Sequence, residues 1–144
     1  MAFTCEVVFP QACETVFDLV ADVERYPEFV PHWRAARVVA RHGDGSYETL
    51  QAVSFGPVSQ KFHTLTTVER PRRLTIKALK GPFRAFFIDW RFSPMGAESG
   101  GGCRVALRFE VDMKAGPMQR LVDHAIGQMS HQMIEAFRRR AALL

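Results

Sequence analysis

The chain has 144 residues, 47% of them hydrophobic, and this size and composition predict one globular domain over residues 1–144 rather than a disordered chain. The net charge of +4 is too small to indicate DNA binding, although it is compatible with an anionic membrane surface or ribosomal RNA. Three cysteines without metal-ligand spacing (Cys5, Cys13 and Cys103) predict reduced thiols in a cytoplasmic compartment. We expect neither a signal peptide nor a transmembrane segment.

The first part of the chain predicts a strand followed by two short helices. Residues 2–9 alternate loosely and are rich in Phe and Val, which is typical of a strand, and Pro10 ends it. Residues 12–23 carry apolar side chains at helical spacing. Pro27 and Pro31 then limit the next segment to a second short helix and a turn.

The middle of the chain predicts six further strands separated by turns that contain glycine or proline. Consecutive strands with short connections favour an antiparallel meander. The glycine-rich stretch 96–102 is interpreted as a hairpin loop. We expect the strands at residues 34–41, 46–55, 58–69, 73–79, 84–93 and 103–113.

A long helix is predicted after Gly116-Pro117, because proline is tolerated in a first helical turn. It could run to about Leu143. Its apolar residues recur at helical spacing, so one face must cover the sheet. The stripe consists of Met118, Leu121, Val122, Ala125, Ile126, Met129 and Met133. The predicted fold class is α+β, with a curved antiparallel sheet of about six or seven strands around this helix.

One helix cannot fill the concave face of such a sheet, so either large side chains or a ligand must occupy the remainder. The chain has 12 Phe and 2 Trp, and methionines on the last helix would adapt to an irregular shape. An aromatic and methionine lining suits a long apolar ligand. The pattern alone does not separate a hollow interior from a filled core, and both interpretations stay open at this point.

The sequence offers little for catalysis or metal binding. His124 and His131 share a helix face but have no third ligand at a suitable spacing, and no Gly-x-Ser-x-Gly motif occurs. Glu110 and Asp112 point away from the apolar face of their strand. We therefore predict no catalytic residues, no metal and no catalytic cofactor. The basic run Arg138–Arg140 either stabilises the helix C-terminus or contacts lipid headgroups or RNA phosphates.

Several segments together resemble a known family. They are Ala21-Asp22-Val23-Glu24 with Tyr26-Pro27-Glu28-Phe29-Val30-Pro31, Val53-Ser54-Phe55, Phe62-x-Thr64, Gly81-Pro82-Phe83, and Trp90-Arg91-Phe92-Ser93-Pro94. In this order they are similar to the coenzyme Q-binding START-like family of the polyketide cyclase and lipid-transport superfamily. The resemblance covers essentially the whole chain.

The resemblance implies a helix-grip fold and binding of ubiquinone or a similar isoprenoid lipid in support of respiratory electron transport, without catalysis. Peripheral contact with the inner face of an anionic membrane is a further expectation. The family also includes the bacterial ribosome association toxin, so binding to the large ribosomal subunit is the alternative. A continuous basic surface from Arg34, Arg37 and Arg41 to Arg138–Arg140 would favour that alternative. A cyclase-like enzyme is a third interpretation, and it would need a buried ionisable pair.

For the lipid, we expect the quinone head to find polar partners among Gln51, Thr64 and Thr66, with Pro31 and Trp33 at the entrance. The predicted ligand-binding residues are Phe29, Trp33, Val53, Phe55, Phe62, Thr64, Trp90, Phe92, Phe109, Leu121, Val122, Ala125 and Met129.

Overall fold

The computed structural model describes residues 2–55 and 58–144, apart from the side chains of Phe55, Val58 and Ser99. The elements follow the predicted order closely. A short 3-10 helix, η2, interrupts the predicted loop at 96–102. The elements are β1 (Ala2–Phe9), α1 (Cys13–Ala21), η1 (Val23–Arg25), α2 (Tyr26–Phe29), β2 (Trp33–Arg41), β3 (Tyr47–Phe55), β4 (Val58–Glu69), β5 (Arg73–Lys80), β6 (Phe83–Pro94), η2 (Ala97–Ser99), β7 (Cys103–Met113) and α3 (Gly116–Ala141).

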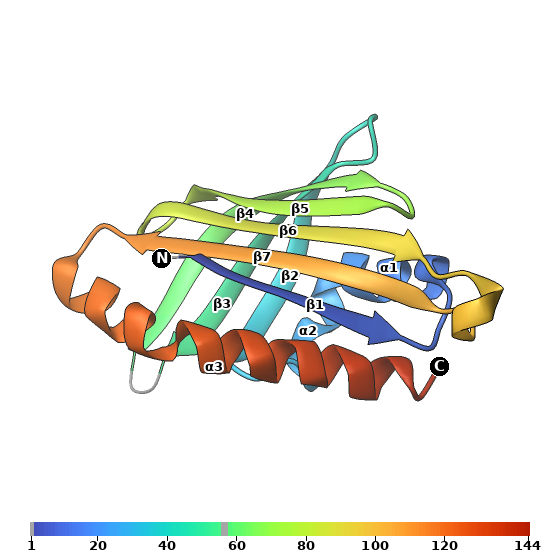
Figure 1. Ribbon diagram of the computed structural model, residues 1–144. Coiled ribbons are helices and arrows are strands. Elements are labelled where there is room, and N and C mark those ends of the chain that lie inside the picture. The colour runs from blue at the N-terminus through green and yellow to red at the C-terminus, as the bar shows by residue number, and fades with distance from the viewer. Residues whose placement is uncertain (1, 56–57) are drawn as a thin grey trace.

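The seven strands form one antiparallel sheet in the order β1-β7-β6-β5-β4-β3-β2. Each strand from β2 to β6 pairs with the next strand in the chain, as a meander requires. The first strand instead pairs with the last, with Ala2 opposite Glu110 and Phe9 opposite Cys103. The sheet curves so that β2–β4 turn across the direction of β6 and β7, and α3 lies along its open side (Figure 1). This is the predicted helix-grip arrangement.

Side chains alternate between the two faces of the sheet, and the apolar face points to the interior. The strand β7 follows this rule along its whole length, with buried side chains at every second position from Cys103 to Met113. In β3 and β4 the inward positions are partly polar and include Thr49, Gln51 and Thr64. The interior of this sheet is therefore apolar on the β5–β7 side and mixed on the β3–β4 side.

The helix α3 packs against β7, β1, α1 and α2. Pro117 lies in its first turn, as predicted, and Arg138–Arg140 lie in its last turn. Val122, Ile126 and Phe137 are buried on the face that contacts the other elements. Within the described residues, no helix combines the length and the apolarity needed to cross a bilayer.

Two tyrosine hydroxyls donate hydrogen bonds to the last carbonyls of α1. The last carbonyls of a helix have no partner within the helix and need one from elsewhere. Here the Tyr26 hydroxyl donates to the carbonyl of Val20, and the Tyr47 hydroxyl donates to the carbonyl of Ala21. Burial raises the pKa of Tyr47 to about 12 and that of Tyr26 well above its usual value. Both phenols thus stay protonated as donors over the physiological range.

The expectation of three reduced thiols is wrong for this structure. Cys13 and Cys103 form a disulfide between residues 90 positions apart in the chain, and only Cys5 is free. The pairing of Phe9 with Cys103 brings the turn after β1, and with it the start of α1, against the first residue of β7. Gly102 allows this approach, because a Cβ there would lie 2.3 Å from the Phe9 carbonyl oxygen. Sequence spacing alone gave no indication of this contact.

Candidate ligand site between the sheet and the last helix

Aromatic side chains from four elements meet at the C-terminal half of α3. The Phe137 ring is fully buried and lies 5.1 Å from Phe29, 5.2 Å from Trp90 and 5.3 Å from Tyr26, measured between ring centroids. The ring planes are close to perpendicular, which is a favourable arrangement for aromatic pairs. We call this group the Phe137 cluster. It also includes Trp33, beside Tyr26, and Phe92, stacked on Trp90.

A second aromatic group, the Phe86 cluster, lies on β4, β6 and β7. Phe86 contacts Phe62, Phe83 and Phe109 with centroid separations of 4.8–5.6 Å. Six of the predicted ligand-binding residues therefore belong to these two clusters: Phe29, Trp33, Trp90 and Phe92 to the first, and Phe62 and Phe109 to the second. In this conformation the rings pack against one another, so a ligand would have to separate them.

A chain of hydrogen bonds runs across the inward face of β2, β3 and β4. The Trp33 indole Nε1 donates to Gln51 Oε1 over 2.7 Å, and Gln51 Nε2 donates to Thr64 Oγ1 over 2.9 Å. Thr64 Oγ1 in turn lies 3.4 Å from the carbonyl oxygen of Thr49. Gln51 is 4% exposed and both threonines are fully buried. Sequence reasoning singled out Gln51 and Thr64 as head-group partners, and the structure links them directly.

Three buried hydroxyls have no hydrogen-bond partner among the described residues. Thr49 Oγ1 and Thr66 Oγ1 lie on β3 and β4, beside these hydrogen bonds, and Ser130 Oγ lies on the buried face of α3. A buried polar atom without a hydrogen bond costs free energy, so such atoms are rare and mark places that a ligand or water can satisfy. We define the interior polar patch as Thr49, Gln51, Thr64 and Thr66, all buried and on inward positions of β3 and β4.

The remaining predicted lining residues differ in their positions. Val53 and Val122 are buried, whereas Ala125 and Met129 are half-buried. Leu121 is 38% exposed, so its expected place in the lining is wrong for this structure. It lies one residue before Val122, about 100° around the helix, and falls outside the covered stripe. The side chain of Phe55 lies outside the described part of the structure.

The predicted entrance at Pro31 and Trp33 is tied to α3 at two points. His32 Nε2 lies 3.1 Å from Gln132 Oε1. Arg140 Nη2 donates to Glu28 Oε1 over 2.6 Å, and its guanidinium lies over the Phe29 ring at 5.0 Å from the centroid. These contacts join the segment before β2 to the second half of α3.

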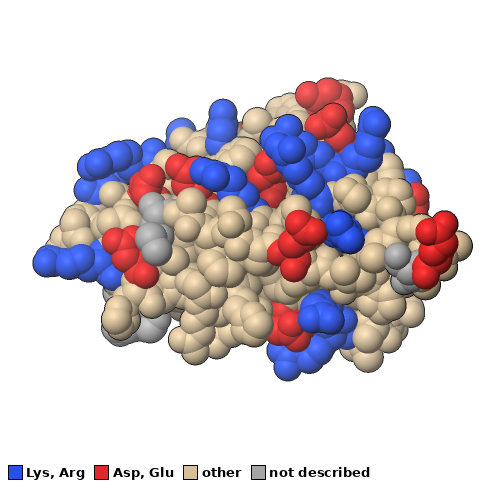
Figure 2. Space-filling model, in the orientation of Figure 1, with Lys and Arg blue, Asp and Glu red and all other residues tan. Residues whose placement is uncertain are grey.

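The basic residues on β2 and at the end of α3 do not form one unbroken positive surface. Residues 22–29, which include η1 and α2 and contact both β2 and α3, carry Asp22, Glu24 and Glu28. Asp22 and Glu28 pair with Arg25 and Arg140, and Glu24 accepts a hydrogen bond from Val38 N. The side of β1, β7 and α3, which faces the viewer in Figure 2, also carries intermixed basic and acidic side chains. The feature proposed to mark ribosome binding is thus interrupted by acids.

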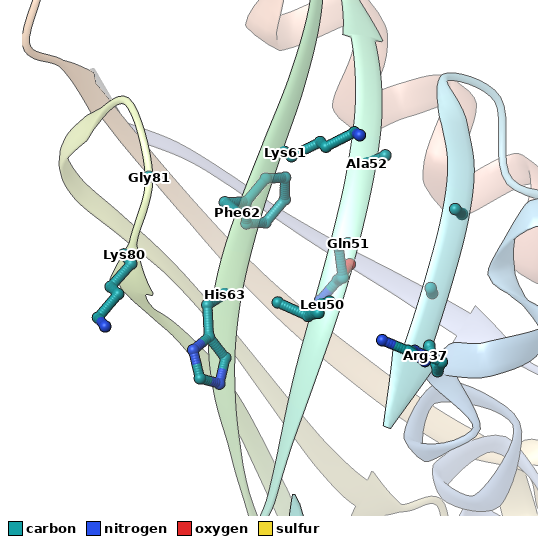
Figure 3. Close-up of a pocket in the computed structure, with 11 residues that line it drawn as sticks. Arg37, Leu50, Gln51, Ala52, Lys61, Phe62, His63, Lys80 and Gly81 are labelled. Atoms are coloured by element: carbon teal, nitrogen blue, oxygen red, sulfur yellow. The ribbon is translucent and has the colours of Figure 1, made fainter. Parts of the chain in front are cut away.

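A pocket of about 690 Å³ lies on the outer face of the sheet, over β2, β3 and β4 (Figure 3). Strand alternation directs Leu50, Lys61 and His63 away from the interior, because their neighbours Gln51, Phe62 and Thr64 point inward. Sequence reasoning did not find this pocket. Its signal in the sequence is weak: two small residues, Ala35 and Ala52, on outward positions of neighbouring strands.

Solved structures with a similar fold come from several bacteria. A Streptomyces aromatase/cyclase, Zhui, superimposes with a TM-score of 0.85 at 11% sequence identity and covers 99% of this chain and 93% of its own. A START superfamily protein from Mycobacterium smegmatis has a TM-score of 0.77 at 22% identity, covering 99% and 97%. An 18 kDa protein from Caulobacter crescentus has a TM-score of 0.79 at 26% identity, covering 98% and 95%.

Relatives in sequence extend over nearly the whole chain. The ribosome association toxin RatA of Pseudomonas aeruginosa is 31% identical over 141 residues, which are 95% of this chain and 92% of that protein. The protein of the same name from Escherichia coli is 25% identical over 136 residues, or 92% and 81%. Residues 10–138 match the family described as polyketide cyclase / dehydrase and lipid transport. This protein therefore belongs to the polyketide cyclase / dehydrase and lipid transport family.

Proposed function

We propose that this protein binds an apolar lipid with an uncharged polar head, ubiquinone or a similar isoprenoid quinone, between the sheet and α3, and that it carries or shields the lipid without reacting with it. The observation that carries this proposal is the interior polar patch, with its hydrogen-bonded Gln51 and Thr64 and its unpartnered Thr49 hydroxyl. Quinone carbonyls accept hydrogen bonds, and threonine and serine hydroxyls donate them.

The absence of charge around the patch favours a neutral head. Asp89 is the one buried Asp, Glu, Lys or Arg in the described part of the chain, and it lies on the outer face between Arg73 and Arg91. A carboxylate or phosphate head would have no cation to pair with inside, and burial of an unpaired charge is costly. Since Asp89 is the one buried charged residue among those described, the interior also has no buried acid–base pair for a cyclase-like reaction.

The aromatic clusters supply the apolar surface for the isoprenoid tail. Since their rings contact one another here, lipid entry requires ring rotation or movement of α3 away from the β3–β4 side. The packing of α3 is compatible with such movement, because its most extensive contacts are with β7, α1, β1 and α2. Binding would thus widen the space over the polar patch and leave the β7 contact in place.

The test is native extraction followed by mass spectrometry of the bound lipid, with a titration of the lipid-free protein by a short-chain ubiquinone. We expect a quinone to co-purify. We also expect the short-chain quinone to quench the fluorescence of Trp33, whose indole donates a hydrogen bond to Gln51. Thr64→Val should weaken binding by about tenfold, because one buried hydrogen bond contributes about 1–1.5 kcal/mol. The matched control is Thr67→Val, at an exposed position of the same strand.

A second candidate function is association with the large ribosomal subunit. Similarity to proteins named ribosome association toxin over 95% of the chain favours it. Sedimentation of a cell lysate on a density gradient tests this directly. If no quinone is recovered and the protein sediments with large subunits, the lipid proposal is wrong and the second candidate replaces it.

A further inference from the structure

The pocket on the outer face of the sheet has a composition unlike that of the interior. Its eleven lining residues include three cations, Arg37, Lys61 and Lys80, and no Asp or Glu. None of these three cations has an ion-pair partner among the described residues. Elsewhere on the surface most arginines are paired, for example Arg70 with Asp18 and Arg104 with Glu6. The pocket therefore concentrates uncompensated positive charge.

Cross-strand register explains the shape of this pocket. Arg37, Leu50, His63 and Lys80 lie opposite one another on β2, β3, β4 and β5, and Ala35, Ala52 and Lys61 form the adjacent row. Directly opposed residues on one face are in contact range. The two alanines leave a hollow beside Leu50, which is 43% exposed. Figure 3 shows Arg37, Lys61 and Lys80 at separate points around Leu50.

The turn between β5 and β6 closes one side of the pocket. Gly81 sits against β4 so closely that a Cβ there would lie 2.7 Å from the Phe62 Cβ. This contact holds Lys80 next to His63 at the pocket wall. The nearest acid on β3, Glu48, already bridges two histidines, with Oε1 2.9 Å from His63 Nε2 and Oε2 2.7 Å from His42 Nε2. Glu48 therefore contacts these two histidines rather than Arg37, Lys61 or Lys80.

We propose that this outer pocket binds an anionic amphiphile, a molecule with one apolar chain and a carboxylate or phosphate head. The chain would lie over Leu50, Ala35 and Ala52, and the head would pair with Lys61, Lys80 or Arg37. A pocket of about 690 Å³ is within the range of small-molecule sites, about 300–1,000 Å³. The proposal goes beyond the function proposed above, because the ligand differs in charge and the site is on the opposite face of the sheet.

A single-stranded RNA fits this pocket less well, although phosphates would also pair with the cations. RNA recognition relies on aromatic or guanidinium surfaces on which bases stack. Phe62 is the single aromatic residue of the lining apart from His63, and it is 3% exposed and packed against Phe83 and Phe86. The exposed floor is aliphatic. The test therefore also measures RNA binding.

The test is calorimetric titration of the whole protein with dodecanoate and, separately, with dodecyltrimethylammonium, both below micelle formation. We expect dodecanoate to bind and the cationic amphiphile not to bind. Lys61→Ala and Lys80→Ala should each weaken binding by about threefold to fivefold, and added salt should weaken it further. Ala52→Leu fills the hollow and should reduce affinity by about tenfold. Lys77→Ala, an exposed lysine of β5 outside this pocket, is the matched control and should bind as the parent protein does.

Two further arms separate the sources of such a ligand and the two sites. Vesicles of phosphatidylcholine with and without phosphatidylglycerol show whether the anionic amphiphile is taken from a bilayer or from solution. Binding that Ala52→Leu weakens, either to the vesicles or to dodecanoate, supports the proposal. Thr64→Val, in the interior polar patch, should leave dodecanoate binding unchanged. The proposal is overturned if Thr64→Val abolishes binding while Ala52→Leu does not. It is also overturned if a uridine oligonucleotide binds through Lys61 and Lys80 and dodecanoate does not.

Discussion

His32 Nε2 lies 3.1 Å from Gln132 Oε1, and this contact joins the turn before β2 to the second half of α3 across 100 positions of the chain. His32 has a φ of +75°, a left-handed conformation that is uncommon for a residue with a side chain. Its carbonyl oxygen accepts a hydrogen bond from Ser54 N, so the turn is held to β3 as well. The imidazole is thus fixed at the edge of the interior.

We predict that Gln132→Leu loosens α3 without unfolding the protein. Loss of this half-buried hydrogen bond should cost about 1 kcal/mol and speed the release of a bound quinone. Hydrogen exchange of the α3 amides, together with stopped-flow release of the quinone, measures both effects. Gln128→Leu, at an exposed position one turn earlier, is the control. Unchanged exchange in α3 would show that the contact does not hold the helix.

Phe137 is predicted to be the main anchor of α3. Its fully buried ring contacts Tyr26, Phe29 and Trp90, so Phe137→Ala leaves a large cavity between the helix and the sheet. We expect the free energy of unfolding in urea to fall by about 3–5 kcal/mol. Leu143→Ala, at a position 79% exposed, should change it very little. Equal effects of the two substitutions would contradict the packing described for Phe137.

The stability of the fold should fall at alkaline pH through Tyr47. Its pKa is raised to about 12 by burial, whereas an unfolded tyrosine ionises near pH 10. The contribution is therefore complete below about pH 10 and is lost as the pH rises towards 12, where the folded protein must also release the proton. Urea denaturation at increasing pH measures this dependence.

Tyr47→Phe separates this titration from the hydrogen bond to α1. At neutral pH the substitution leaves the Ala21 carbonyl without its hydroxyl donor and should cost about 1–2 kcal/mol. The alkaline decrease should become shallower than in the parent protein, because one buried phenol no longer titrates. An identical pH dependence in the two proteins would contradict the assignment.

The disulfide predicts a specific pattern of thiol labelling. After denaturation without reductant, an alkylating agent should label Cys5 alone, and after reduction it should label all three cysteines. Cys103→Ser should lower the free energy of unfolding by about 2–5 kcal/mol, since the bond closes a long loop in the unfolded chain. Cys5→Ser is the control and should have a small effect. Labelling of all three thiols without reductant would show that Cys13 and Cys103 are not bonded.

Periodicity and turn residues were sufficient to predict most of the fold. The alternation from Cys103 to Met113 predicted both the strand and its buried face. Pro117 correctly marked the start of the last helix, and the glycine and proline turns divided the middle of the chain into the observed strands. These signals succeeded because each is local: whether a segment forms a strand or a helix depends on side chains only two to four positions apart.

The features that were missed depend on contacts between distant segments. Cys13 meets Cys103 only because the first strand pairs with the last. The hollow beside Leu50 arises from Ala35 and Ala52 on neighbouring strands, and it needs the register of three strands to become visible. The amphipathic pattern placed Leu121 in the lining, but the partners of α3 determine how wide a stripe they cover.

The pairing of β1 with β7 has a consequence for synthesis of the chain. When the first hundred residues have left the ribosome, β1 is present but the strand that separates it from β6 is not. The pairing of β1 and the disulfide of Cys13 can form only after residues 103–113 have been made, whereas β2–β6 can already pair with one another. A contact between the two ends of a domain delays its folding. The sheet is therefore completed, and its interior covered by α3, only when nearly the whole chain has been made.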